Sequence, residues 1–472
     1  MIETIVIIGA GYTGTLSAAL LSNLKRKNDQ RIYRIVLLDE RNSILDGASK
    51  VIDRLHLGGE YPLDQASALS CLQGALYFKQ MLPDVYSKAE ATNYILAEET
   101  EKEGTLTFER MIQNYTTIQQ SYSAYFDIFS NLHGKERAIH LLFGHPNTLF
   151  SEITDLSYVK GFKKGLVTKE KGINPVILGA FLESYLHENS VEILTNHRVI
   201  DAKKTECGFD ITTQTGNTTK VLKANQVINA SWQNAFSVNQ YISPHTNHDE
   251  LNVFLRCSAV VDITDCPNVN TSYFGMLGKH GGSYSPMNDK IAFIYFPDTS
   301  GSYLGECVQN AGNPLFPSLW VDYIKNGIID KEERGKFILS SLTKCYPFLE
   351  KAKILNLFVR PVLSSRKELE KRRYETVKQI DSDGKWISAL SMKAVFAPTN
   401  ALDIVRIIQQ NSMNDNFISK NECLIVDTKC DIVLPKEFIL SNTRFYHKAF
   451  KAYARQYALA RQLPIEMVED EK

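Results

Sequence analysis

The amino-terminal stretch of the chain contains a glycine pattern that can bind phosphate. Gly9, Gly11 and Gly14 have the spacing GxGxxG and enclose Tyr12 and Thr13. In this pattern the first glycine allows a tight turn, the second lets the backbone approach a diphosphate, and the third lets a helix pack closely on a strand. The helix that follows points free N–H groups and the positive end of its dipole at the phosphates. These residues predict a dinucleotide site.

A dinucleotide site also needs an acidic residue that binds a ribose hydroxyl at the end of the next strand. The segment RIVLLD ends on Asp39, and Glu40 follows it. Asp39 is somewhat farther from Gly14 than the usual spacing of about 20 residues. The polar stretch 25–30 explains the difference as a longer loop. We expect Asp39 to bind the ribose, with Glu40 as the alternative.

These residues need particular elements to position them. Residues 5–8 are β-branched and apolar, which is typical of a buried parallel strand. We expect a helix over 15–23 and a second buried strand over 34–39. Strand, glycine turn, helix and strand in this order form a βαβ unit.

Composition narrows the class of protein. The 472 residues can form two or three domains, and the 53 basic residues equal the 53 acidic ones. This balance argues against nucleic acid as the main partner. None of the eight cysteines forms a CxxC pair and the histidines lack ligand spacing, so we expect no metal site. The apolar stretch 5–21 contains glycines and hydroxyl residues and follows an acidic residue, so we expect it to be neither an export signal nor a membrane span. We therefore expect a cytoplasmic protein.

The rest of the chain changes character twice. Residues 66–150 are mostly helical in pattern, and their aromatic residues are interpreted as packing. Asn174 and Pro175 begin a further helix. Alternating residues over 251–296 predict an antiparallel sheet. Short strands and one helix complete the pattern: strands at 191–194, 198–203, 208–213 and 227–230, a hairpin at 374–380 and 385–390, and an amphipathic helix at 398–410.

We therefore expect an α/β fold with a discontinuous cofactor domain of the Rossmann type. Its pieces are residues 1–65, 170–240 and 350–412. A helical insertion occupies 66–169, a substrate domain with an antiparallel sheet occupies 241–349, and a C-terminal extension occupies 413–472. We expect the segment 444–461 to dock as a helix on the protein itself, with a membrane surface as the alternative.

Six short segments share features with one family. They are Gly47-Ala48-Ser49, the LHLGGEY of residues 55–61, Asn174-Pro175 with Val199, the VINASW of residues 227–232, Val359-Arg360-Pro361, and Ser391-Met392-Lys393-Ala394. In this order they resemble the D-amino acid oxidase-like superfamily of FAD-dependent oxidoreductases, one branch of which contains the aerobic glycerol-3-phosphate dehydrogenases. Each segment alone is unspecific, whereas six in the family's order are specific.

The resemblance implies FAD as the cofactor, a choice that the glycine pattern alone leaves open against NAD. By the resemblance, Ser49 and Arg54 lie along the diphosphate and ribityl chain, Val199 contacts adenine, and Asn229 and Ala230 end a strand beside the cofactor. Two departures concern the surroundings of the flavin ring. Trp232 stands where the family usually has glycine, and Ser391-Met392 replaces a glycine pair.

Four residues are candidates for substrate chemistry. His56 is interpreted either as a general base or as a packing residue in its glycine-rich turn. Arg360 can hold a carboxylate or phosphate, and a structural salt bridge is the alternative. Lys393, just before the helix at 398–410, can stabilise negative charge on the reduced flavin, or it is a solvated loop residue. His280 is a weaker candidate, for which a turn position is the expected role.

The sequence therefore predicts an oxidoreductase that transfers a hydride to flavin N5 from a small, anionic amine, amino acid, hydroxy acid or polyol phosphate. A flavin-binding protein without turnover, with a scaffold or regulatory role, is one alternative. An NAD-dependent Rossmann enzyme is the other. The sequence leaves the substrate and the electron acceptor open.

Overall fold

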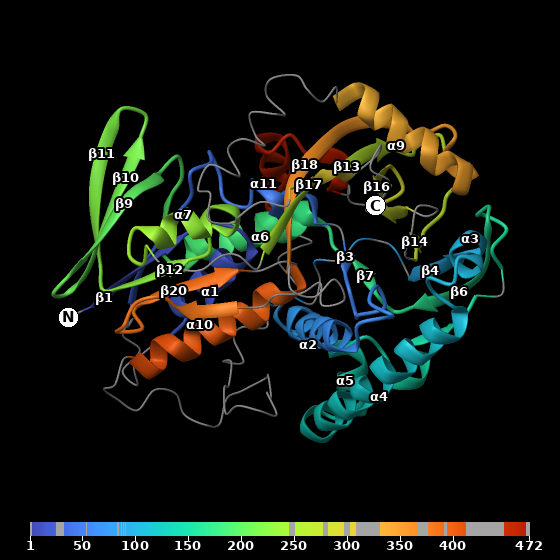
Figure 1. Cartoon of the computed structure of the whole chain (residues 1–472), viewed down its shortest axis with the longest axis horizontal. Helices are drawn as coiled ribbons and strands as arrows, with labels where there is room; N and C mark the ends of the chain where they lie inside the picture. The colour runs from blue at the N-terminus through green and yellow to red at the C-terminus, as the bar shows by residue number, and fades with distance from the viewer. Residues whose placement is uncertain are drawn as a thin grey trace.

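The computed structural model describes most of the chain. The described residues are 2–24, 33–52, 54–82, 85, 87, 89, 91–153, 155–244, 251–276, 282–296, 303–307, 331–365, 376–390, 394–411 and 448–468. They form an α/β structure with two large sheets, and Figure 1 shows these sheets at opposite sides of the molecule.

A six-stranded, mostly parallel sheet contains the amino-terminal strands together with strands from later in the chain. Its order is β19-β20-β12-β1-β2-β8. The strands are β1 (Glu3–Ile8), β2 (Tyr33–Leu38), β8 (Glu192–Leu194), β12 (Gln226–Asn229), β19 (Thr376–Gln379) and β20 (Trp386–Leu390). The predicted βαβ unit is confirmed, because β1 pairs in parallel with β2 and helix α1 (Tyr12–Ser22) connects them. The helix begins three residues before the predicted start, with Gly11 as its N-cap.

Both faces of the centre of this sheet are buried, which explains why β1 and β2 are continuously apolar over residues 5–8 and 35–38. On one face Ile5 and Ile7 pack with α1, α6 (Pro175–Glu188) and α10 (Ala397–Asn411). On the other face Val6 and Ile8 pack with a three-stranded antiparallel sheet of β9 (Arg198–Thr205), β10 (Gly208–Thr215) and β11 (Thr218–Ala224). Helix α7 (Ala235–Gln240) lies on this side too, as Figure 1 shows.

The second large sheet is the predicted antiparallel one. Its order is β17-β13-β16-β15-β14-β4-β6-β5, and β18 pairs with β13. The strands are β4 (Thr92–Ala97), β5 (Phe150–Glu152), β6 (Phe162–Thr168), β13 (Leu251–Asp262), β14 (Ser272–Gly275), β15 (Ser283–Pro286), β16 (Ile291–Tyr295), β17 (Tyr303–Cys307) and β18 (Lys353–Ser365). One face packs against α9 (Lys331–Cys345), as in the contact cluster of Ala259 with Leu342.

The segment predicted to be a helical insertion is only partly helical. It contains α2 (Gln65–Met81), α3 (Glu98–Lys102), α4 (Phe108–His133) and α5 (Lys135–Leu141). It also contributes β4, β5 and β6 to the second sheet, where β4 pairs in parallel with β14. The strands were missed because their partners lie elsewhere in the chain. The segment is therefore part of the sheet as well as a helical layer.

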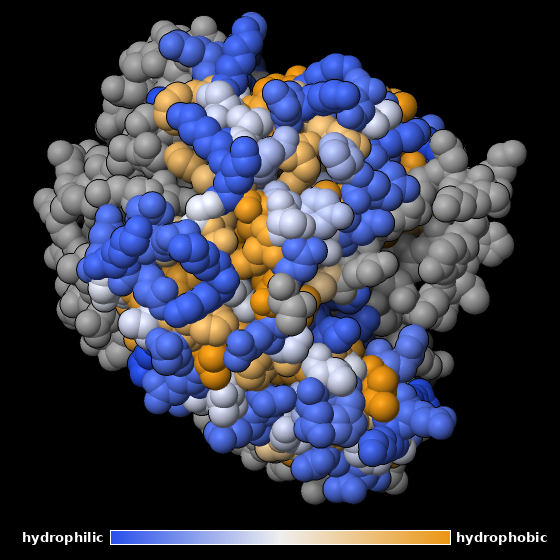
Figure 2. Space-filling view, turned by 90° about the vertical axis from the view of Figure 1, so that its right-hand side faces the viewer, coloured by the Kyte–Doolittle hydropathy of each residue, from blue (hydrophilic) through white to orange (hydrophobic). Residues whose placement is uncertain are grey.

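The carboxyl-terminal part of the described chain packs on the protein. Helix α11 (Lys448–Ala460) lies against α6, with Ala454, Tyr457 and Ala458 buried in the main core. Among the described residues, no helix is both long and apolar enough to cross a membrane. Figure 2 shows the side that carries α3, α4 and β6, where hydrophobic side chains form an interrupted band between hydrophilic ones.

Candidate functional site

The glycine loop lies at the carboxyl ends of three neighbouring parallel strands. Gly9 follows β1 and has a φ of +98°, and a Cβ there would lie 2.6 Å from Ala230 O. A Cβ on Gly14 would lie 1.9 Å from Gly9 O, so helix and loop can pack this closely only with glycine. Ala230 N donates to Ile8 O, which fixes the end of β12 beside the loop. In parallel α/β sheets, this edge is where ligands bind.

The start of α1 fits a phosphate group. No side chain caps Gly11, so the N–H groups of the first turn remain available for a ligand. The Thr13 hydroxyl is buried and has no hydrogen-bond partner among the described residues. Ser49 Oγ lies 3.3 Å from where a Cβ of Gly11 would stand. The loop thus combines an uncapped helix terminus with two hydroxyl groups, which fits the diphosphate of a dinucleotide.

Asp39 connects the loop to the end of β2. Its Oδ2 accepts a hydrogen bond from Ala10 N at 2.7 Å, and its Oδ1 accepts one from Arg41 N at 2.9 Å. Burial raises the pKa of this carboxyl, and the two backbone hydrogen bonds oppose that effect. A carboxylate has further lone pairs, so Asp39 can still accept a ribose hydroxyl. Glu40 is instead bonded to Asn234 Nδ2 at 3.0 Å, near the surface.

Val199 and Asn229, two further residues proposed to bind the cofactor, lie near this edge. The Asn229 side chain is hydrogen-bonded to other parts of the protein. Val199 is buried on β9, two residues after His197, whose N–H donates to Asp39 O. The Asn229 amide donates to Ala235 O and to Asn239 Oδ1, and its Oδ1 accepts from Ser231. The Asn229 side chain therefore supports the strand end, and its proposed contact with the cofactor remains a prediction.

The loop that follows Ser49 reaches the second sheet. Lys50 Nζ lies 5.4 Å from the centre of the Phe358 ring on β18. Arg54, on the short strand β3 (Arg54–Leu55), places its guanidinium carbon 4.1 Å from the centre of the Phe274 ring on β14. The loop of residues 49–61 therefore joins the dinucleotide loop to the antiparallel sheet.

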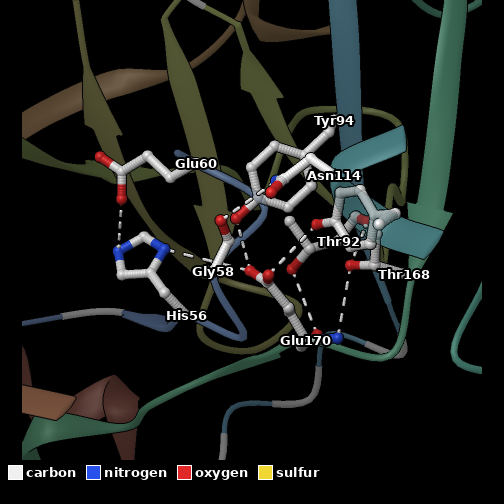
Figure 3. A network of polar contacts seen from close by, with 9 residues as sticks. His56, Gly58, Glu60, Thr92, Tyr94, Asn114, Thr168 and Glu170 are labelled. Atoms are coloured by element: carbon white, nitrogen blue, oxygen red, sulfur yellow. Dashed lines mark hydrogen bonds and ion pairs between the residues drawn. The ribbon is translucent and has the colours of Figure 1, made fainter. Parts of the chain in front are cut away.

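His56 lies on this connection, between two carboxylates. Its Nε2 is 3.0 Å from Glu60 Oε2, and its Nδ1 is 4.0 Å from Glu170 Oε2 (Figure 3). The histidine is 8% exposed and the Glu170 side chain 2% exposed. An imidazole held in this way is a candidate for accepting a proton in a reaction.

Glu170 is the centre of a larger buried network. Tyr94 Oη donates to its Oε2 at 2.5 Å and Tyr115 Oη to its Oε1 at 3.2 Å. Burial raises the pKa of Glu170 and raises the pKa of both tyrosines well above the usual value, so the phenols remain donors. Gly59 is necessary here, because a Cβ would lie 1.7 Å from Tyr115 Oη.

Sequence reasoning missed most of this network. Glu60 belongs to the LHLGGEY segment, so the sequence indicated that it lies near the site. The sequence did not indicate that it pairs with His56. Glu170 lies between two lysines and looks like a solvated residue in the sequence. Its tyrosine partners come from β4 and α4, far away in the chain, and no local pattern indicates them.

Three predicted residues lie wholly or partly outside the described residues. Lys393 and His280 are outside them altogether. Arg360 is placed by its backbone only, in β18 opposite Arg256 of β13. Their proposed roles remain predictions.

Trp232 keeps a backbone geometry that favours glycine. Its φ is +50°, in the left-handed region, at the position where the resembling family usually has glycine. For a residue with a Cβ this costs about 1–2 kcal/mol. The Trp232 indole N–H is buried and has no partner among the described residues. Trp232 in place of glycine therefore adds a large side chain beside the end of β12, while the backbone keeps the left-handed turn.

The sheet, the glycine loop and the acid at the end of β2 define a dinucleotide-binding protein of the Rossmann class. Residues 4–244, just over half of the chain, match the family described as FAD dependent oxidoreductase, abbreviated DAO. The chain belongs to this family, and its cofactor is FAD. A comparison with curated proteins found no match.

Solved structures with the same fold support this classification. Dithionite-reduced L-alpha-glycerophosphate oxidase from Mycoplasma pneumoniae with FAD bound has 17% identity and a TM-score of 0.59, over 89% of this chain and 97% of that one. Glycine oxidase from Geobacillus kaustophilus has 13% identity and a TM-score of 0.58, over 88% and 97%. L-proline dehydrogenase from P. horikoshii has 13% identity and a TM-score of 0.58, over 87% and 94%. At these identities the likeness concerns the fold.

Proposed function

We propose that this FAD-dependent oxidoreductase oxidises a small anionic amine, amino acid, hydroxy acid or polyol phosphate. Bound FAD supplies the acceptor for a hydride from the substrate carbon. The observation that best supports the proposal is the position of His56, held between Glu60 and Glu170 on the loop that joins the dinucleotide loop to the antiparallel sheet. The solved relatives named for glycerophosphate, glycine and proline lend support, because each of these molecules carries a phosphate or carboxylate.

We assign His56 the role of the base. When a carbon that bears a hydroxyl or amino group loses a hydride, the oxygen or nitrogen must lose a proton. The Glu60 and Glu170 carboxylates on either side of the ring hold the imidazole in place for this step. The nearby Glu170 carboxyl then stabilises the positive charge on the ring.

Two cationic residues complete the proposal. Arg360 anchors the anionic group of the substrate. Its position in β18 is two residues beyond Phe358, so strand alternation gives both positions the same face of the sheet. Phe358 lies beside Lys50, which follows Ser49. Lys393, immediately before η5 (Ala394–Phe396) and α10, supplies positive charge toward the cofactor.

An anaerobic reduction assay tests this function. The purified protein is mixed with members of the four substrate classes, and bleaching of the flavin absorbance is followed. We expect one class to bleach the flavin. His56→Gln should slow that step by about 10²–10⁴-fold with normal FAD content. Arg360→Met should raise the substrate concentration needed for half-maximal rate. If dithionite bleaches the flavin and no substrate class does, the protein is a flavin-binding protein without turnover of these substrates.

A further inference from the structure

A buried arginine after the last long helix reaches the loop beside the cofactor site. Arg461 follows α11 and is 2% exposed. Its Nε and Nη2 donate to Ile44 O at 2.9 and 2.7 Å. Its Nη2 also donates to Glu183 Oε2 of α6 at 3.2 Å, and the Tyr457 ring centre lies 3.5 Å from its guanidinium carbon. All three guanidinium nitrogens thus donate inside the protein, because Nη1 also donates to Tyr457 O at 3.3 Å.

The peptide that Arg461 holds is bonded directly to the glycine loop. The Ile44 carbonyl and the Leu45 N–H belong to one peptide group, and Leu45 N donates to Ala10 O at 2.8 Å. Ala10 N in turn donates to Asp39 Oδ2 at 2.7 Å. A continuous series of hydrogen bonds therefore runs from Arg461 through one peptide to the middle of GxGxxG. Hydrogen bonds in such a series polarise one another in a buried setting.

The same peptide carries backbone strain. Leu45 is buried and has a φ of +57°, a left-handed conformation that a branched side chain rarely adopts. Such a conformation persists only where the surrounding contacts hold it. Arg461 on one side and Ala10 on the other provide those contacts.

The carboxyl-terminal segment gives Arg461 a fixed position. Asn174 Nδ2, on the N-cap residue of α6, donates to Met467 O at 2.8 Å. Asn288, next to the antiparallel sheet, donates to Glu466 O. A Cβ on Gly179 would lie 1.9 Å from Tyr457 Oη, so α6 and α11 are in close contact. The segment is therefore held by the start of α6 and by the turn between β15 and β16 of the antiparallel sheet.

We propose that Arg461 is a positioning residue for FAD binding. It acts through the Ile44–Leu45 peptide, which sets the position of Ala10 and of the following loop with Ser49. It needs no contact with FAD itself. The carboxyl-terminal segment, remote in sequence from the glycine loop, thus becomes a part of the cofactor site.

FAD titration into the apoprotein, followed by flavin fluorescence, tests the proposal. Arg461→Met should weaken FAD binding on the order of tenfold to a hundredfold, since charge-assisted hydrogen bonds are lost. Arg461→Lys keeps the charge but can replace only one of the two hydrogen bonds to Ile44 O, so it should lose less, about threefold to tenfold. If Arg461→Met does not fold, Arg461→Lys decides: wild-type affinity overturns the proposal and a measurable loss supports it.

Two control variants separate positioning from general stability. Arg34→Met removes an exposed arginine that pairs with Glu192 at the edge of the same domain, and FAD affinity should not change. Glu183→Gln removes the ionic partner of Arg461 but leaves both bonds to Ile44 O. It should lower the melting temperature of the apoprotein with FAD affinity within about threefold of wild type. Wild-type affinity in Arg461→Met, or an equal loss in Glu183→Gln, would overturn the proposal.

Discussion

Asp39 accepts the Ala10 and Arg41 N–H groups at the cofactor edge, and we propose that its remaining lone pairs accept a ribose hydroxyl. Asp39→Ala should therefore weaken FAD binding by about tenfold to a hundredfold, the worth of a charge-assisted hydrogen bond of about 1.5–3 kcal/mol. FAD titration of the apoprotein measures this. Glu40→Ala is the matched control and should leave the affinity unchanged. An effect in Glu40→Ala and none in Asp39→Ala would move the ribose contact to Glu40.

Glu170 gives a prediction about pH. Burial raises its pKa in the folded protein above the ordinary value of 4.5, so the folded state keeps a proton that the unfolded chain has released. Stability should therefore fall as the pH rises from 4.5 through the folded-state pKa, by about 1.4 kcal/mol for each unit of the shift. Glu170→Gln cannot titrate, so its melting temperature should lose less over this range.

The exposed Glu136 on α5 offers a matched control for this pH effect. Glu136→Gln should keep the pH dependence of the wild-type protein. Melting curves of the three proteins across this range measure the difference. The same pH dependence in Glu170→Gln and wild type would mean that Glu170 does not carry the proton.

At the residue scale the sequence predicted the parts of the site that are local. The glycine pattern and Asp39 follow from spacing along one βαβ unit, and the structure places them at one edge. The Glu170 network was out of reach, because a glutamate between two lysines has no local mark of burial. Of its partners, Tyr115 was interpreted as a packing residue and Tyr94 was not singled out.

At the scale of elements, local patterns succeeded where the element is formed by its own residues. The helix predicted at 398–410 is α10, and the predicted hairpin is β19 with β20. Strands β4 and β6 were missed. Their apolar residues look helical next to α2 and α4, and their state is decided by pairing with each other and with β14. Long-range pairing of this kind leaves no local sequence signal.

The contact between α6 and α11 gives a prediction at this scale. Alanine is about 1 kcal/mol better than glycine inside a helix. At Gly179, however, a Cβ would lie 1.9 Å from Tyr457 Oη and 2.2 Å from its Cζ. Overpacking of this kind costs about 1–3 kcal/mol, so Gly179→Ala should lower the melting temperature.

Gly335 of α9 is the matched control, because its added Cβ would meet no backbone atom and only side-chain atoms of Ile354, the nearest at 3.2 Å. Gly335→Ala should be neutral or raise the melting temperature. An increase for Gly179→Ala equal to that for Gly335→Ala would show that α6 and α11 are not in close contact.

At the scale of the whole molecule, segments distant in the chain meet beside one loop. The glycine loop lies against β12, the loop of residues 44–49 reaches Arg461, and the loop of residues 49–61 reaches the antiparallel sheet. This arrangement places His56 on the connection between the glycine loop and the antiparallel sheet. The fold class can be predicted from the sequence pattern. The contacts between these distant segments can be seen only in the folded structure.

The central claim is that this edge of the six-stranded sheet binds FAD. The most direct measurement incubates the apoprotein with equal concentrations of FAD, FMN and NAD, removes unbound cofactor, and identifies by mass spectrometry what the denatured protein releases. We predict FAD, because the glycine loop and Asp39 fit a diphosphate and an adenosine ribose, which FMN lacks, and because residues 4–244 match a family of FAD-dependent oxidoreductases. Release of FMN or NAD, or of no cofactor from folded protein, would contradict this assignment.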